Sequence, residues 1–138
     1  MSRNNILLTI ALAVLLGTLF SCKAPVYTDA FVRAADADEN GCYRFALDLS
    51  DSLCTYDVYL YTKVDGGDLH TGIPFNIRWK SPAGEVSGDV VYWNPKDTKA
   101  LYRSGVKPAE RGEWDLSIAV LGNVKVRGLC VILEKKYD

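Results

Sequence analysis

The fold of this chain is decided by one stretch of ten residues, Thr55-Tyr-Asp-Val-Tyr-Leu-Tyr-Thr-Lys-Val64. Apolar or aromatic residues recur at every second position from Tyr56 to Leu60, which is the period of a β-strand with one face in a core. The glycines of Asp65-Gly-Gly-Asp68 then end the strand, because glycine adopts the backbone angles of a tight turn. The residues predicted to face outward are Asp57, Tyr59, Tyr61 and Lys63.

Similar alternation over most of the remaining chain predicts an all-β fold. Short turn signals separate the alternating segments, and we find no amphipathic helical pattern of useful length. This arrangement predicts an antiparallel β-sandwich of six or seven strands, and it leaves the immunoglobulin-like and jelly-roll topologies both open. The other predicted strands lie near residues 43–49, 73–80, 85–93, 114–120 and 128–135.

Two segments depart from simple alternation. Residues 94–111 contain Asn-Pro, Ser-Gly, Lys-Pro and Arg-Gly steps, so we expect a long loop there. Residues 128–135 are apolar on both faces, which is typical of a strand near the centre of a fold. Four acidic residues of the predicted strands are expected on outer faces: Asp48, Asp57, Asp89 and Asp115.

The first 22 residues predict the destination of the chain. Arg3 precedes an apolar block over residues 6–20, which has the length of a signal-peptide hydrophobic region. Residues 19–22 read Leu-Phe-Ser-Cys and resemble the lipobox of bacterial lipoproteins, in which the cysteine thiol receives diacylglycerol and becomes the new N-terminus. We therefore expect residues 1–21 to be a lipoprotein signal peptide and Cys22 to be lipidated. An ordinary secretory signal with an incidental cysteine is the alternative.

Residues 22–40 are predicted to carry the lipid and to tether the sandwich domain of residues 41–138, with Val26, Tyr27, Phe31 and Val32 as an alternative first edge strand. Without residues 1–21 the chain has 15 Lys and Arg against 17 Asp and Glu. This nearly neutral chain offers no basic surface for nucleic acid or for lipid headgroups. We therefore expect attachment through the lipid in a bacterial cell envelope, and Lys23 favours the outer membrane.

Taken in order, several features resemble the gliding-motility lipoprotein GldH and its relatives, over most of residues 41–135. This resemblance implies a non-enzymatic envelope lipoprotein that works through protein partners. The features are the lipobox, Tyr43-Arg-Phe45, Thr55-Tyr-Asp-Val-Tyr-Leu60, Pro82-Ala-Gly84, Gly112-Glu-Trp114 and Gly128-Leu-Cys-Val-Ile-Leu-Glu-Lys135.

The sequence contains no strong catalytic or metal-binding pattern. Asp36, Asp38 and Asn40, followed by glycine, match the opening of a calcium loop, but Leu47 stands where a closing glutamate is required. A polar loop explains the same residues, so we expect no metal and no cofactor. His70 is the only histidine, which excludes a two-histidine zinc site, and we expect no enzymatic activity.

Three cysteines remain besides Cys22. Cys42 and Cys54 lie 12 residues apart around a predicted strand, and a disulfide between them requires the following turn to bring them together. Cys130 lies in an apolar strand, where a cysteine usually acts as a small buried side chain.

Aromatic residues are the remaining candidates for a binding site. Exposed tyrosine and tryptophan are typical of protein interfaces, and they also stack on sugars. Our leading hypothesis is a non-catalytic lipoprotein that binds another envelope protein, and the alternative is a surface glycan-binding lipoprotein with Trp93 and Tyr102 as a stacking pair. A position of these rings in the core is a third interpretation. The predicted interface residues are Tyr59, Tyr61, Tyr92, Trp93 and Tyr102.

Overall fold

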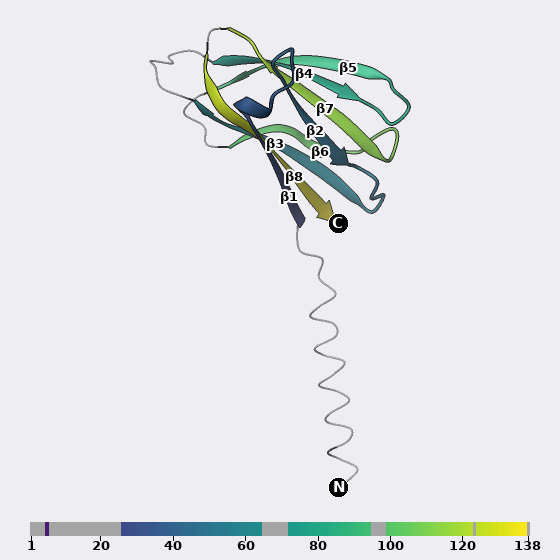
Figure 1. Cartoon of the computed structure of the whole chain (residues 1–138). Coiled ribbons are helices and arrows are strands. Elements are labelled where there is room, and N and C mark those ends of the chain that lie inside the picture. Colours follow the sequence, from purple (N-terminus) through teal and green to yellow (C-terminus); the bar gives the residue numbers. More distant parts are fainter. Residues whose placement is uncertain (1–4, 6–25, 65–71, 95–98, 123, 138) are drawn as a thin grey trace.

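The computed structural model describes Asn5 and residues 26–64, 72–94, 99–122 and 124–137. Eight strands form two four-stranded antiparallel sheets that pack against each other (Figure 1). The predicted β-sandwich is confirmed, with eight strands in place of six or seven. Sheet A contains β1 (Val26–Arg33), β8 (Val126–Tyr137), β3 (Cys54–Val64) and β6 (Ala100–Val106), in this order. Sheet B contains β2 (Cys42–Asp48), β7 (Glu113–Val120), β4 (Ile73–Lys80) and β5 (Val86–Trp93), in this order.

The strands pair as one long hairpin that is rolled up. β4 pairs with β5, β3 with β6, β2 with β7 and β1 with β8, and successive pairs belong to alternate sheets. This is the jelly-roll arrangement, one of the two topologies that the sequence left open. The tip of the hairpin is the predicted reverse turn, where the Gly84 amide donates to the Ser81 carbonyl at 2.9 Å.

The core lies between the two sheets and includes most of the residues that alternation predicted to face inward. Burial of each large apolar side chain stabilises the fold by about 1.5–3 kcal/mol. Trp79 and Trp93 are included, although both are indoles with a polar edge. The most deeply buried core residues are Leu49, Tyr56, Val58, Ile73, Phe75, Ile77, Leu116, Ile118, Leu129 and Val131.

Strand β1 lies in the segment that we interpreted as a tether. Its eight residues pair in continuous register with β8, from Val26 opposite Lys135 to Arg33 opposite Gly128. The alternative of a first edge strand is therefore what the structure shows. β1 also places β8 between two neighbours, in agreement with the prediction that this apolar strand is central.

Strand β6 corrects the prediction of a loop over residues 94–111. Its alternation is broken where Gly105 adopts a φ of 64° and where the register with β3 shifts on both sides of Val58. A β-bulge of this kind changes which side chains face inward, so a period of two is lost from the sequence. β6 is therefore a strand whose sequence lacks the regular alternation that predicts one.

Candidate functional site

The outer face of sheet A carries a group of large aromatic and apolar side chains, which we call the aromatic face. It consists of Tyr27, Phe31, Tyr59, Tyr61 and Leu101. Phe31, Cys130 and Tyr61 lie in one cross-strand row, and the next row contains Tyr59 and Leu101. Tyr27, Phe31 and Leu101 are 58%, 56% and 54% exposed, whereas the two β3 tyrosines are half-buried. Neighbouring rings thus come from strands that are distant in sequence.

Glycine makes room for the ring of Phe31. A Cβ atom at Gly128 would lie 2.4 Å from Phe31 Cζ and 2.7 Å from the carbonyl oxygen of Val32. The aromatic ring therefore lies directly over the β8 backbone, at a position where only a residue without a side chain fits. This contact fixes one end of the aromatic face.

A polar network lies beneath the rings. The Tyr59 hydroxyl donates to Glu134, which is only 5% exposed, with an O–O distance of 3.1 Å. Lys99 Nζ lies 4.0 Å from the centre of the Tyr59 ring and 5.5 Å from that of Tyr27. Burial and this hydrogen bond raise the pKa of Tyr59. The Glu134 hydrogen bond and the Lys99 contact therefore both hold the ring of Tyr59 in place.

Asp57 is on the outer face, as predicted, but it is buried. Its carboxylate accepts hydrogen bonds from the Gly105 amide at 2.8 Å and from the Ser104 hydroxyl at 3.2 Å. It also pairs with Lys136 at 2.6 Å. Hydrogen bonding by Lys136 is the main reason that the pKa of Asp57 is lowered. Asp57 thus fixes the β6 bulge next to the aromatic face.

The other predicted interface residues lie elsewhere. Tyr92 is 74% exposed on the outer face of sheet B, opposite Pro74. Trp93 is only 4% exposed, and its ring stacks on Phe75 with centroids 6.5 Å apart. Its burial corresponds to the core interpretation, so it presents no surface to a partner. Tyr102 is half-buried between the sheets, and the proposed Trp93–Tyr102 stacking pair is not among the ring contacts of the described residues.

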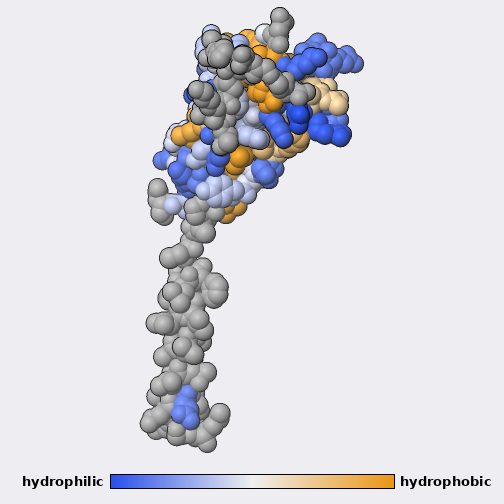
Figure 2. Space-filling model, turned by 90° about the vertical axis from the view of Figure 1, so that its left-hand side faces the viewer, coloured by the Kyte–Doolittle hydropathy of each residue, from blue (hydrophilic) through white to orange (hydrophobic). Residues whose placement is uncertain are grey.

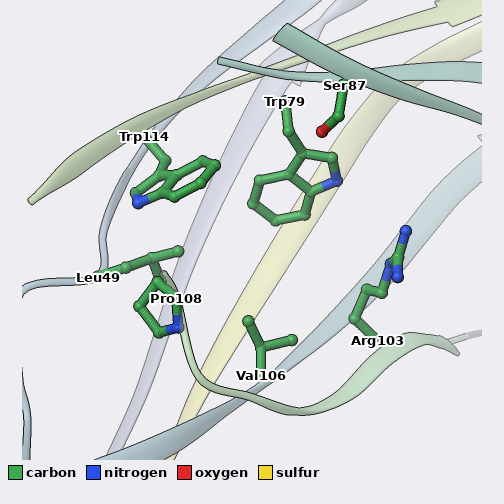
Figure 3. Close-up of a pocket in the computed structure, with 7 residues that line it drawn as sticks. All are labelled: Leu49, Trp79, Ser87, Arg103, Val106, Pro108 and Trp114. Carbon is green, nitrogen blue, oxygen red and sulfur yellow. The ribbon is translucent and has the colours of Figure 1, made fainter. Parts of the chain in front are cut away.

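A pocket of about 200 Å³ opens between the edges of the two sheets. Figure 3 shows the indoles of Trp79 and Trp114 side by side above Leu49, Pro108 and Val106. The two indoles form an edge-to-face pair with centroids 6.3 Å apart. Their ring nitrogens donate to the Tyr102 hydroxyl at 3.0 Å and to the Glu110 carbonyl at 2.8 Å, respectively. The rings are therefore fixed, and their carbon surfaces line the pocket.

Strands β5 and β6 are connected across this opening by a polar bridge. The Tyr102 hydroxyl donates to Asp89 at 2.9 Å, and Arg103 pairs with the same carboxylate. The hydrogen bond from Tyr102 is the main reason that the pKa of Asp89 is lowered. The prediction that Asp89 faces outward was wrong, because it pairs with Ile77, whose side chain faces the core.

The calcium-like sequence forms a turn that its own backbone completes. Asp38 accepts hydrogen bonds from the amides of Asn40 and Cys42 at 2.9 Å each, and its second oxygen pairs with Arg44 at 2.8 Å. Asp36 pairs with Arg33. In the part of the chain that the structure describes, no cluster of His, Cys, Asp or Glu is arranged to hold a metal ion. These residues therefore act as the polar loop that the sequence also allowed.

The Cys42–Cys54 disulfide, which the sequence left as a possibility, is not formed. Both thiols are free, as is that of Cys130. Cys42 begins β2 in sheet B, whereas Cys54 begins β3 in sheet A beyond the far end of β2. A strand of seven residues spans about 20 Å, which a disulfide cannot bridge.

Several predictions concern residues outside the described part of the chain. They are the signal peptide of residues 1–21, lipidation at Cys22, and His70 in its loop. Among the described residues, no helix is long and apolar enough to cross a membrane.

Sequence reasoning missed Tyr27 and Phe31 as members of the aromatic face and Trp79 and Trp114 as pocket residues. The alternation of residues 26–33 did contain a signal for the first pair, because a paired strand exposes every second side chain on one face. The inward phase predicted both tryptophans in the core, but nothing in their spacing indicated that they meet at an opening.

The fold and these two sites define a small β-sandwich with an exposed aromatic face and a pocket between the edges of its sheets. No protein-family model matches the chain, and no curated protein matches it. The resemblance to GldH therefore stays a prediction. One solved structure, described as "Bacillus endospore appendages form a novel family of disulfide-linked pili", contains a chain with 15% sequence identity to this one. The alignment covers 86% of this chain and 97% of that chain, with a TM-score of 0.31, a value too low to carry an argument about function.

Proposed function

We propose that this protein is a non-catalytic, lipid-anchored component of a bacterial envelope assembly. It binds another envelope protein through the aromatic face. The observation that carries the proposal is the exposure of Tyr27 and Phe31 beside the fixed ring of Tyr59. The lipobox and the resemblance to gliding-motility lipoproteins support the location, with the outer membrane as the expected site.

The aromatic face has the chemistry of an interface centre. Tyr and Phe supply a large contact area and lose little side-chain entropy on binding. The face also has charged residues at its border, since Lys63 follows Tyr61 on β3 and Arg33 follows Phe31 on β1, and both are exposed. An apolar centre with a polar rim is the usual anatomy of a specific protein interface.

Tyr61 is the best position for a test. Replacement of Tyr59 would remove one of the two tyrosine hydroxyls that hydrogen-bond to the buried Glu134, so it would confuse an effect on binding with an effect on stability. Tyr61 lies on the same face and is half-buried. Among the hydrogen bonds of the described residues, none links the Tyr61 side chain to a buried carboxylate as Tyr59 is linked to Glu134. We therefore choose Tyr61→Ser, with Tyr92→Ser on the outer face of sheet B as the matched control.

The experiment is a mild crosslink of the intact lipidated protein in its native membrane, followed by affinity purification and mass spectrometry. We expect a stoichiometric envelope protein whose recovery falls at least about tenfold with Tyr61→Ser, because loss of an interface ring typically costs about 2 kcal/mol. Tyr92→Ser should leave the recovery unchanged, and both variants should keep the thermal midpoint of the wild type. Equal recovery from all three proteins would contradict the proposal.

A second candidate function is surface glycan binding, and the pocket between Trp79 and Trp114 favours it. Carbon faces of indoles stack on the apolar faces of sugar rings, and Ser87 and Arg103 supply polar groups to the lining (Figure 3). The test is a glycan array with the intact lipoprotein in detergent. A signal that Trp114→Ala removes would support glycan binding, and the absence of any signal would argue against it.

A further inference from the structure

We infer that the end of the sandwich where β1 begins rests against the membrane, so that the aromatic face points sideways toward a protein at the same membrane surface. This inference rests on the lipid anchor of the proposed function. It adds an orientation, a membrane-contacting residue, Leu53, and a location for the partner.

The anchor leaves little distance between lipid and domain. Cys22 precedes Val26 by four residues, and an extended chain advances at most about 3.6 Å per residue. The lipidated residue can therefore lie no more than about 14 Å from the first residue of β1. A domain on so short a connection cannot turn its opposite end toward the membrane.

Leu53 lies at that same end. Val26, Lys135 and Tyr56 form one cross-strand row, and Leu53 precedes Tyr56 by three residues, or about 10 Å along the strand direction. Figure 1 shows β1 beginning at the end where β8 finishes. In Figure 2, a small apolar area is visible among hydrophilic surface at the lower end of the domain.

Leu53 is exposed in spite of a well-fixed loop. The Leu53 amide donates to the Asp51 carboxylate at 2.9 Å, and this carboxylate also accepts a hydrogen bond from the Tyr137 hydroxyl at 2.6 Å. The Asp51 amide donates in turn to the Tyr56 hydroxyl at 3.0 Å. Leu53 is nevertheless 69% exposed, and Val26 at the same end is 48% exposed. A rigid loop that holds a leucine in solvent next to a lipid anchor has the form of an interfacial contact.

The orientation places the partner. The strands of sheet A run from the membrane-contacting end to the far end. The outer face of this sheet therefore lies on the side of the domain and not on the end that is farthest from the membrane. The row of Phe31 and Tyr61 lies five residues along β1 and β3 from the row of Val26 and Tyr56. The aromatic face thus stands perpendicular to the bilayer and points sideways, where a protein of the same membrane can meet it.

The test uses the full-length protein, expressed and processed in a bacterial envelope, with the photocrosslinking residue benzoylphenylalanine introduced at one position at a time. The positions are Leu53 at the predicted membrane end, Tyr61 on the aromatic face, and Leu121 as the matched control. Leu121 is also an exposed loop leucine, but it follows β7 and its amide donates to Pro74 near the start of β4, at the opposite end.

We expect phospholipid adducts from Leu53→benzoylphenylalanine at least about fivefold above those from the other two positions, and a protein adduct from position 61. Lipid adducts from position 61 equal to those from position 53 would mean that the domain lies flat on the aromatic face, and they would overturn the orientation. Lipid adducts from position 121 would overturn it as well.

The same experiment separates this inference from the proposed function. Mass spectrometry of the purified chain shows whether Cys22 is acylated, and an unmodified cysteine would overturn both. Acylation with lipid adducts at position 53 but no protein adduct at position 61 would support the orientation and contradict the proposed interface. Acylation with a protein adduct at position 61 but no lipid adduct at position 53 would overturn the orientation alone.

Discussion

The buried carboxylate of Asp57 offers the sharpest test of how the aromatic face is supported. Asp57→Asn keeps the size of the side chain but removes the charge that pairs with Lys136 and accepts from Gly105 and Ser104. Loss of one partner of a buried ion pair costs about 3–5 kcal/mol. The Lys136 side chain is 49% exposed and can be hydrated, so we expect a smaller loss of about 2–3 kcal/mol at pH 7.

The assay is urea unfolding of the purified protein, monitored by tryptophan fluorescence. With a slope of about 1.5 kcal/mol per molar urea, a loss of about 2.5 kcal/mol lowers the midpoint by about 1.7 M. The matched control is Asp115→Asn, because Asp115 is exposed on sheet B and its replacement should change the free energy of unfolding by less than about 0.5 kcal/mol.

The pH dependence adds a second readout. The folded-state pKa of Asp57 is lowered, so its contribution is fully present above the unfolded-state pKa of about 3.9 and is lost as the pH falls through the folded-state pKa. The difference between wild type and Asp57→Asn should therefore be constant from pH 5 to 7 and shrink below pH 4. A difference under about 0.5 kcal/mol at pH 7, or one that grows in acid, would refute the reasoning.

Three further predictions concern packing and thiols. Gly128→Ala should lower the free energy of unfolding by about 2–3 kcal/mol in the same urea assay, and Phe31→Ala should restore only part of it because the Val32 carbonyl still obstructs the new methyl group. Trp93→Phe should change the free energy of unfolding by less than about 1 kcal/mol, because the Trp93 indole nitrogen is buried without a hydrogen-bond partner among the described residues. Trp79→Phe should lower the free energy of unfolding by about 1–2 kcal/mol, because it loses the hydrogen bond to Tyr102. Cys42, Cys54 and Cys130 should all be alkylated in the unreduced, denatured protein, and dithiothreitol should leave the thermal midpoint unchanged; a lower midpoint under reduction would show a disulfide.

The strands with a regular period were predictable because one face of each is fully buried. Residues 73–80 illustrate this, since Ile73, Phe75, Ile77 and Trp79 are all buried and alternate with more exposed residues. β6 was not predictable, because its period is interrupted at the bulge near Gly105 and it lies at an edge where few side chains are buried. β1 was ambiguous for the same reason, with only Val32 half-buried among its eight residues.

The candidate site was predictable only in part, because its members meet through pairings of very different sequence separation. Tyr59 and Tyr61 could be assigned to an outer face from the period of β3 alone. Their neighbours Tyr27 and Phe31 join them only through β8, which lies about a hundred residues away from β1 in sequence. No periodicity within one segment carries that information.

The same pairing explains why β1 is the most informative strand to perturb. Among the described strands of sheet A, β1 pairs with β8 alone; its side chains are mostly exposed, and it begins four residues after the predicted lipid-bearing cysteine. A load between the membrane and a partner on the aromatic face would therefore pass through the eight paired residues of β1 and β8. Side chains that contribute little to the core, such as Tyr27 and Phe31, lie on the strand that would join the proposed anchor and the proposed partner surface to the centre of sheet A.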